Sequence, residues 1–386
     1  MTNMAITNIT HIRLRNWKNF KQTEAKLDHR VFVIGPNASG KSNFLDVFRF
    51  LQELATSGLS KAVGARGGVS SIRCLAATSY PNVDIEVTLG SDTGDLWKYE
   101  LVINQDKASR PIVKKEIVTS LVKGQRHLNR PDDGDKTDPE RLTQTALEQV
   151  AANKEFREVS DFFKSISYQH LIPQVVRDPK AFTSSPVQND PFGRDFLMRV
   201  WTTNKNTRDS RLEKIGMVLA VAVPQLQELR IDMDGRGSPH LMARYEHWRP
   251  KGAIHQEAQF SDGTLRLLGL LWSVFEGTGP LLLEEPELSL HAEVVRYLPQ
   301  MFERIHRARK VKRQTIMSTH SEELLRDKSI GPSEILWLEP SKNGTLIRTS
   351  ESQDQLMFDA GLTAADIFLP KSAPRDSNQL PLALDD

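Results

Sequence analysis

The pattern of hydrophobic and polar positions predicts a mixture of strands and helices that changes character along the chain. A predicted strand, Ile6–Leu14, opens the chain, and after a polar bend comes a short apolar strand, Val31–Ile34. Apolar residues then recur at helical spacing over Asn43–Leu54. From about residue 80 to 122 polar and apolar residues alternate, which is typical of an antiparallel sheet with one solvated face. The alternating segments are Val83–Val87, Tyr99–Ile103 and Ile112–Val118.

The second half of the chain alternates between helical and strand patterns. Residues 123–140 contain Gly, Pro and charged residues with almost no apolar ones, so we predict a loop there. Residues 141–260 show mainly helical patterns with a few short strands. Further on, helices and strands alternate, which favours a parallel sheet covered by helices. The four segments are Gly263–Phe275, Leu281–Glu284, Glu293–Ile305 and Thr315–Ser318.

The fold class predicted from these patterns is α/β, with an antiparallel side sheet and a helical insertion. A chain of 386 residues has room for about two or three domains of ~100–200 residues. We expect an N-terminal lobe over 1–125, a mainly helical insertion over 126–255, a C-terminal lobe over 256–369 and a mobile Pro- and polar-rich tail over 370–386.

Composition excludes several classes of protein. The 51 Lys+Arg nearly balance the 49 Asp+Glu, so no strongly basic character indicates a nucleic-acid binder. The longest apolar stretches, Ile215–Val223 and Leu267–Phe275, are well short of the roughly 18 residues that span a membrane. The N-terminus lacks the apolar core of a signal peptide. A single cysteine, Cys74, excludes an internal disulfide framework, so we expect a cytoplasmic protein without a membrane partner.

A glycine-rich loop joins the strand Val31–Ile34 to the helix that follows it. Its sequence, Gly35-Pro-Asn-Ala-Ser-Gly40-Lys41-Ser42, is a Walker A motif in the strand–loop–helix context that this motif requires. Its glycines allow backbone N–H groups to converge on phosphate, and the helix N-terminus adds partial positive charge. We predict that Lys41 reaches the β- and γ-phosphates and that Ser42 binds Mg²⁺. The predicted ATP-binding residues are Gly35, Asn37, Ala38, Ser39, Gly40, Lys41, Ser42 and Asn43.

Two carboxylates, Glu284 and Glu285, end the apolar strand that begins at Leu281, a pattern typical of a Walker B motif. Ligands of parallel α/β sheets bind at the carboxyl ends of the strands. Because successive strand side chains point to opposite faces, one carboxylate can face a metal while the next faces the attacking water. We assign Glu284 to Mg²⁺ and Glu285 to the general base. The alternative is a surface acidic cluster before the turn at Pro286.

Two further segments stand out in this half of the chain. Ser261-Asp262-Gly263-Thr264 opens the apolar helix before Leu281, and Thr319-His320-Ser321 follows the strand Thr315–Ser318. Considered alone, Ser261 is a helix N-cap and His320 an ordinary loop histidine. Spacing changes that interpretation, because Glu284 lies 243 residues after Lys41, too far for a compact single-domain P-loop enzyme.

These four elements in this order resemble the ATP-binding-cassette (ABC) ATPases, and within them the RecF/SMC/OLD branch of DNA-associated ATPases. The local strings are most similar to the stand-alone OLD-like AAA ATPases. The resemblance covers about residues 6–60 and 255–340. It is carried by NWKNF at 16–20, GPNASGKSN at 35–43, SDGTLR at 261–266, EEPELSLH at 284–291 and STHS at 318–321.

The resemblance implies a mechanism that uses two copies of the chain. In such families two ATP molecules are sandwiched in a head-to-tail dimer, each between one subunit's Walker A loop and the other's signature motif. The resemblance therefore implies that the signature residues Ser261, Asp262 and Gly263 act in trans, with Ser261 and Gly263 at the γ-phosphate. It also implies that His320 is the switch histidine that senses this phosphate, so that Lys41, Glu285 and His320 are the catalytic residues.

The sequence departs from the family pattern at three points. Glu284 stands where most ABC enzymes have Asp, although its longer side chain can still reach Mg²⁺ through water. Ala292 stands where relatives often have Pro, and no glutamine lies in a context that identifies the Q-loop residue.

The expected function is ATP-driven control of a separate effector. Residues 43–260 lack the long heptads of SMC arms, and the 66 residues after His320 lack the clustered acids of the Toprim nuclease domain found in OLD proteins. The resemblance then implies a role in anti-phage defence, with a separate effector protein acting in trans. A nuclease is the first candidate for this effector.

Two alternatives stay open. The first is RecF-like clamping of DNA in repair, for which the candidate contact is a basic run that also fits a solvated helix end. The second, the motor subunit of a membrane transporter, is disfavoured by the insertion and by the signature. The run comprises Arg304, Arg307, Arg309, Lys310, Lys312 and Arg313.

Overall fold

The computed structural model describes residues 5–77, 79–178, 190–246, 252–307 and 312–372. Their contacts divide the chain into two units. The first unit comprises the described residues of Met1–Ile166, Thr278–Leu282 and Arg309–Asp386, and the second those of Ser167–Gly277 and Leu283–Ala308. The predicted tail lies outside the described residues from 373 onward.

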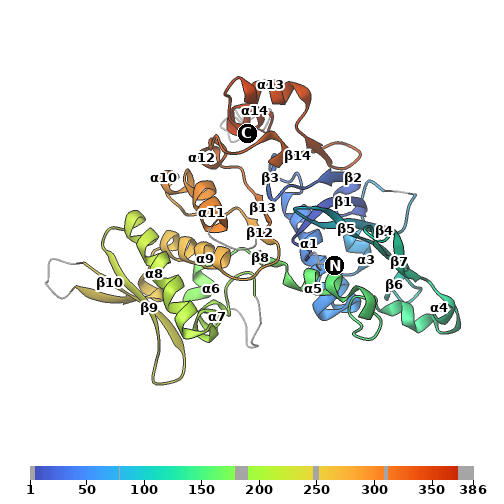
Figure 1. Ribbon diagram of the computed structural model, residues 1–386, viewed down its shortest axis with the longest axis horizontal. Coiled ribbons are helices and arrows are strands. Elements are labelled where there is room, and N and C mark those ends of the chain that lie inside the picture. Colours follow the sequence, from blue (N-terminus) through green and yellow to red (C-terminus); the bar gives the residue numbers. More distant parts are fainter. Residues whose placement is uncertain (1–4, 78, 179–189, 247–251, 308–311, 373–386) are drawn as a thin grey trace, which may run out of the picture. The chain divides into compact units, whose positions relative to one another are not determined.

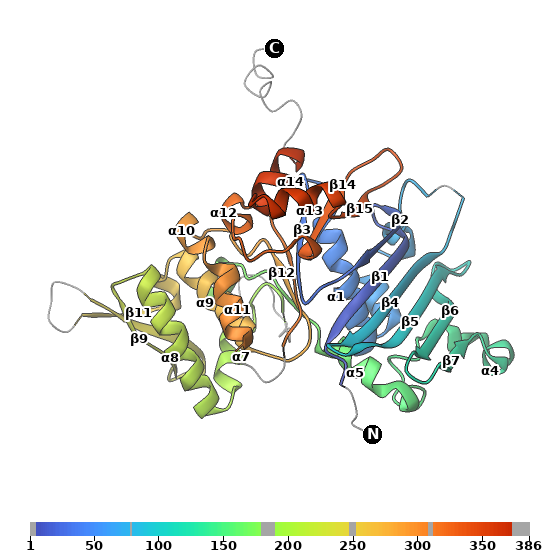
Figure 2. The same cartoon turned by 45° about the horizontal axis from the view of Figure 1, so that its top comes forward.

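An antiparallel sheet makes up one side of the first unit, as the alternating pattern predicts. Its order is β2-β1-β4-β5-β6-β7, and Figure 2 shows β1, β4, β5 and β6 running side by side. Helix α1 (Lys41–Ser57) packs against β1 through aromatic residues, with the Trp17 and Phe50 ring centroids 5.2 Å apart. The strands are β1 (Asn8–Trp17), β2 (Phe20–Lys26), β4 (Val83–Ser91), β5 (Gly94–Gln105), β6 (Pro111–Ser120) and β7 (Gln125–Arg130).

Two of these strands depart from the sequence prediction. The predicted loop over 123–140 is wrong, because Gln125–Arg130 pairs with β6 and Asp133–Thr137 forms α4. Phe20–Lys26 lies within the predicted polar bend and pairs with β1. Both segments are mostly polar, so neither has the apolar alternation from which a strand is predicted; backbone pairing with a neighbouring strand stabilises them instead.

The Walker A loop follows the C-terminal end of β3 (Arg30–Ile34), a central strand of a second sheet in the first unit. The strands of this sheet that lie wholly within the first unit follow the order β15-β14-β3-β13, and β3 runs parallel to both β13 (Thr315–Ser318) and β14 (Ile335–Glu339). At Leu281, where β12 (Leu281–Glu284) begins, the N–H donates to the Gln314 carbonyl at 2.8 Å. The boundary between the units follows Leu282, so Glu284 and β8 (Ser167–Gln169) belong to the second unit. The antiparallel edge strand is β15 (Leu346–Thr349).

Helix α1 (Lys41–Ser57) begins directly after the Walker A loop. Its buried residues include Phe44 and Phe48, whose ring centroids lie 5.3 Å apart, and it ends at Gly58, which has a positive φ of 87°. The prediction of a helix over Asn43–Leu54 is therefore confirmed and extended by about one turn. The other helices of this unit are α2 (Leu59–Gly64), α3 (Val69–Ile72), α4, α5 (Arg157–Ser165), α12 (Glu322–Leu325), α13 (Ser352–Asp359) and α14 (Ala364–Ser372).

The described part of the second unit is mainly helical and contains a small three-stranded sheet. Strands β9 (Leu226–Met233), β10 (Pro239–Tyr245) and β11 (Ala253–Gln256) pair in the order β11-β10-β9. Its helices are α6 (Pro173–Arg177), α7 (Phe196–Thr202), α8 (Lys205–Ala222), α9 (Asp262–Phe275), α10 (Ala292–Val295) and α11 (Leu298–Arg307) (Figure 1).

The predicted helix Glu293–Ile305 is interrupted in the structure. It forms α10 and α11, with Arg296 and Tyr297 between them. Pro299 explains the break, because proline has no N–H with which to continue the hydrogen bonds of α10, while near the start of a new helix it is tolerated. No helix of the described part of the chain is long and apolar enough to cross a membrane.

The predicted insertion 126–255 overlaps both units. Its first part, residues 126–166, lies in the first unit, where β7 pairs with β6 as the last strand of the antiparallel sheet. Residues 256–277, predicted as part of the C-terminal lobe, lie in the second unit.

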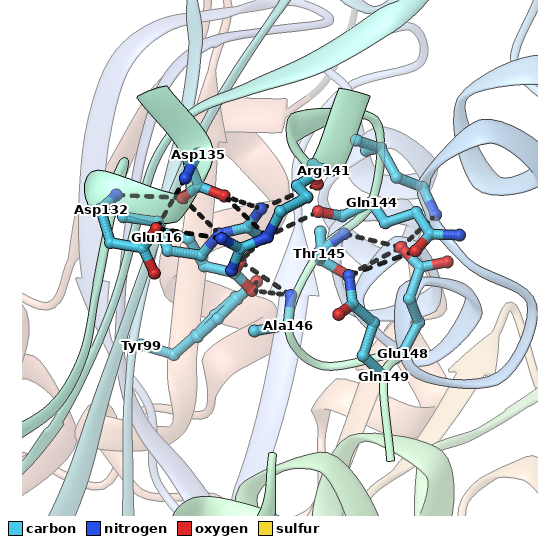
Figure 3. Close-up of polar contacts among 12 residues, drawn as sticks. Tyr99, Glu116, Asp132, Asp135, Arg141, Gln144, Thr145, Ala146, Glu148 and Gln149 are labelled. Carbon is cyan, nitrogen blue, oxygen red and sulfur yellow. Dashed lines mark hydrogen bonds and ion pairs between the residues drawn. The ribbon is translucent and has the colours of Figure 1, made fainter. Parts of the chain in front are cut away.

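A buried ionic network fixes the segment after β7 to the sheet (Figure 3). Arg130 donates to Asp135 through two nitrogens, at 3.0 and 2.9 Å, and to Glu116 at 3.2 Å. Glu116 is fully buried and also accepts hydrogen bonds from the Ala146 N–H and the Tyr99 hydroxyl. Burial raises the pKa of Tyr99 well above its ordinary value, with Glu116 acting in the same direction, so the hydroxyl stays a donor.

Removing the cation of this network should strongly destabilise the first unit. Arg130→Met leaves two buried carboxylates without their cation, and breaking such a buried pair costs about 3–5 kcal/mol of unfolding free energy. Lys136→Met is the matched control, because the Lys136 side chain is 71% exposed and its ion-pair partner, Asp133, is 97% exposed; exposed pairs contribute ~1 kcal/mol or less. Urea unfolding followed by circular dichroism measures both. Equal midpoints for the two variants would contradict this account of the network.

Candidate nucleotide-binding site

The backbone of the Walker A loop requires glycine at position 40. Gly40 precedes α1 with a φ of 99°, a conformation that L-residues with a side chain rarely adopt. A Cβ at this position would lie 2.0 Å from the Asn19 side-chain nitrogen. A larger residue here would therefore displace the Asn19 amide, in addition to adopting an unfavourable backbone conformation. Ala38 also has a positive φ, of 60°, so the loop is held in a bent conformation.

Lys41 lies at the centre of the loop. Its Nζ donates to the carbonyls of Gly35 at 2.9 Å and Pro36 at 3.2 Å, and the residue is 8% exposed. The hydroxyl of Ser39 is buried without a hydrogen-bond partner among the described residues, while Ser42 is exposed at the first turn of α1. A buried ammonium, an unsatisfied buried hydroxyl and a helix N-terminus suit a phosphate group, so these residues fit a bound nucleotide.

Asn19 holds the loop in place, a role that the sequence analysis missed. Its Nδ2 donates to the Ser39 carbonyl at 2.8 Å, and the Thr345 hydroxyl donates to the same carbonyl at 2.8 Å. Asn43, predicted to bind ATP, donates from Nδ2 to Asn19 Oδ1 at 2.9 Å, which is a contact within the protein. The only sequence signal for Asn19 is its place in the NWKNF string at 16–20.

His320 follows the strand beside the one that leads into the Walker A loop. Strands β3 and β13 are parallel, with Val33 opposite Ser318, and the Thr319 N–H donates to the Val33 carbonyl at 3.2 Å. His320 is exposed just beyond this edge. Because the carboxyl ends of parallel strands meet at one edge, the Walker A loop and His320 both extend from the same edge of the sheet.

The acidic pair Glu284 and Glu285 ends β12 at the start of a turn. The Tyr168 hydroxyl donates to Glu284 Oε2, and His170 Nδ1 lies 3.3 Å from the Glu284 carbonyl oxygen. Glu285 has a positive φ of 43°, so the backbone turns at this residue instead of continuing the strand. Non-glycine residues in this region are strained, and such strain clusters at functional sites.

A cleft of the second unit brings further polar groups to the acidic pair. Gln169 is 6% exposed and its Nε2 has no hydrogen-bond partner among the described residues. Burial lowers the pKa of Arg266, while Asp262 and Glu285 act in the opposite direction. Gln169 ends the three-residue strand β8 and lines the same cleft as the acidic pair, and no pattern in the sequence singled it out. The cleft is lined by Gln169, His170, Leu171, Arg266, Leu270, Leu283, Glu284, Glu285 and Pro286.

The signature segment opens α9 as expected. Ser261 is the N-cap, and its hydroxyl accepts a hydrogen bond from the Thr264 N–H at 3.1 Å. Arg177 forms an ion pair with Asp262 at 2.6 Å and thereby holds this end of the helix. Gly263 is required for close packing within the chain, because a Cβ there would lie 2.7 Å from the Ser289 carbonyl oxygen.

Comparison with known protein families shows to which family the chain belongs. Residues 30–326 match the family described as "AAA domain, putative AbiEii toxin, Type IV TA system". The chain belongs to this AAA domain family. The matched range contains the Walker A loop, the signature segment, the acidic pair and His320. No curated protein matches the chain.

Solved structures show that this AAA domain has the fold of an Smc head. One is the Smc head bound to the C-terminal winged-helix domain of ScpA, which is 12% identical with a TM-score of 0.54 over 90% of this chain and 99% of that chain. Another is the Smc head domain from Pyrococcus furiosus with an extended coiled coil, bound to the C-terminal domain of ScpA, which is 12% identical with a TM-score of 0.52 over 92% and 98%. The predicted α/β fold of an ABC-type ATPase head is confirmed.

The basic run between Arg304 and Arg313, the candidate DNA contact of this AAA domain, does not form a single exposed surface. Arg313 is 2% exposed and donates from Nε to the Gly279 carbonyl, so its inclusion in that run is wrong. Arg307 pairs with Glu303 at 2.8 Å. Arg309 and Lys310 lie outside the described residues.

Proposed function

We propose that this AAA domain hydrolyses ATP with Mg²⁺ and uses a cycle of ATP-driven dimerisation to control a partner protein. The observation that carries the proposal is the Walker A loop. In it, Lys41 is buried against the loop carbonyls, the Ser39 hydroxyl has no hydrogen-bond partner among the described residues, and a side chain at Gly40 would clash with the Asn19 amide. The family match supports an ATPase domain of this kind.

In the proposed reaction each functional residue has one task. Lys41 and the loop N–H groups hold the β- and γ-phosphates, and Glu285 accepts a proton from the attacking water. Ser42 and Glu284 supply hydroxyl and carboxylate oxygens, which are the ligands that Mg²⁺ prefers; bound there, the ion would neutralise developing phosphate charge. Gln169, buried beside the acidic pair, would orient water or metal.

The signature segment and His320 support the proposed dimerisation. We propose that Ser261, Asp262 and Gly263 act in trans, with Ser261 and Gly263 contacting the γ-phosphate of ATP bound to a second copy, and that His320 senses the same phosphate. A bound γ-phosphate then bridges two copies, and its loss on hydrolysis separates them. This cycle gives the protein two states that a partner can distinguish.

The partner is proposed to be an effector protein, in first place a nuclease, in an anti-phage defence system of the OLD-like type. The family description names a toxin of a type IV toxin–antitoxin system, which supports a role in a paired system of this kind.

A pull-down tests the partner. Tagged Glu285→Gln protein, captured from its native host with ATP and Mg²⁺, should retain a stoichiometric effector that wild-type protein with ADP does not. Mass spectrometry identifies it. Recovery of the ATPase alone, or with DNA and repair proteins, would contradict control of an effector and favour a RecF-like clamp.

A further inference from the structure

Tyr168 contacts the proposed metal ligand directly. Its hydroxyl donates a hydrogen bond to Glu284 Oε2. Two residues further on, His170 Nδ1 lies 3.3 Å from the carbonyl oxygen of Glu284. All three residues belong to the second unit, so this arrangement is defined within one unit. The segment around β8 thus holds Glu284 at two points, one on its side chain and one on its backbone.

The identity of the acid explains why such a contact is needed. Glu284 has one more methylene and one more rotatable bond than an aspartate, so more conformational freedom is lost when its carboxylate is fixed for a metal. Ordering a long, flexible side chain such as that of Glu costs conformational entropy. A hydrogen bond from a phenol already restricts the carboxylate before any ion binds, which reduces that cost at the moment of binding.

We propose that Tyr168 is a positioning residue that orients the Glu284 carboxylate for Mg²⁺. This inference rests on the proposed function, because it assigns Glu284 to the metal. Carboxylates that bind metals are commonly oriented by outer-shell hydrogen bonds, and loss of such a partner lowers metal affinity by roughly 10–100-fold. Tyr168 does not contact nucleotide in this account, so its effect appears only when Mg²⁺ is present.

The test is a Mg²⁺ titration of nucleotide binding with the full chain. Binding of fluorescent ADP is measured in EDTA and then at increasing Mg²⁺ for wild type and Tyr168→Phe. We expect equal affinities in EDTA and a roughly tenfold higher half-saturating Mg²⁺ concentration for the variant. Tyr297→Phe is the matched control, because Tyr297 belongs to the same unit and is 50% exposed; its titration should overlay that of wild type.

A second variant separates orientation from general stability. Glu284→Gln should also raise the half-saturating Mg²⁺ concentration. Adding Tyr168→Phe to Glu284→Gln should raise it no further, because Tyr168 acts through the Glu284 carboxylate, which that variant no longer has. The role of Tyr168 would be overturned if the Mg²⁺ titrations of Tyr168→Phe and wild type overlay. It would also be overturned if Tyr168→Phe lost as much ADP affinity in EDTA as in Mg²⁺. Wild-type protein that binds no ADP under either condition would overturn the proposed function itself and, with it, the role of Glu284.

Discussion

Lys41→Ala should lower the affinity for ATP by about 100-fold or more. Hydrogen bonds to charged groups contribute about 1.5–3 kcal/mol each, and in the proposed function the ammonium of Lys41 makes such bonds with two phosphates. Its present acceptors, the Gly35 and Pro36 carbonyls, are backbone atoms of the same loop, so its loss removes charge from the site without disturbing the sheet. Isothermal titration calorimetry with ATP in EDTA measures the effect independently of hydrolysis.

Lys61→Ala provides the control for this substitution. Lys61 is an exposed residue of α2 in the same unit, and its loss should leave the affinity within about twofold of wild type. Retention of wild-type affinity by Lys41→Ala would remove the main support for a Walker A site in this chain.

Glu285→Gln should bind ATP within a few-fold of wild type and lose most of its turnover. Positioned general bases contribute typically 10²–10⁴-fold to a rate, and the amide keeps the size of the carboxylate while it can no longer accept the proton. Glu293→Gln, an exposed residue eight positions further on in α10, should retain normal turnover. Phosphate release under saturating ATP distinguishes the two variants. A Glu285→Gln rate within tenfold of wild type would assign the base to another residue.

The sequence predicted the parts of the molecule in which local pattern and tertiary structure agree. The Walker A loop, the strand Thr315–Ser318 and the N-cap Ser261 follow from short-range signals, namely glycine spacing, the alternation of helical and strand segments, and a side chain that caps α9. The alternating segments between residues 83 and 118 predicted the antiparallel sheet for the same reason.

Other features depend on contacts between distant residues and left no local signal. The strand β7 is polar and forms because it pairs with β6, and Arg130 at its end is satisfied by Glu116 on that neighbouring strand. Arg313 has a surface-type sequence context, yet its guanidinium is buried against the Gly279 carbonyl. Neither hydrophobic periodicity nor motif spacing along the sequence shows which distant residues will contact each other.

In the candidate site, too, some residues have a local sequence signal and others do not. Lys41 and the acidic pair were found from motifs, whereas the residues that hold them were not. Asn19 reaches the Walker A loop from a residue 20 positions away in sequence, and Tyr168 reaches Glu284 from 116 positions away. A single sequence gives the motif but not its supporting contacts, because those contacts are set by the packing of strands that are remote in the chain.

ATP-dependent dimerisation is the central claim, and sedimentation of the Glu285→Gln protein tests it most directly. With ATP and Mg²⁺ the protein should sediment as a dimer, and with ADP and Mg²⁺ as a monomer. Ser261→Arg added to Glu285→Gln should restore the monomer in ATP, since the proposed contact of Ser261 lies on the nucleotide of the other copy. A Glu285→Gln protein that binds ATP and still sediments as a monomer at every concentration tested would contradict the account.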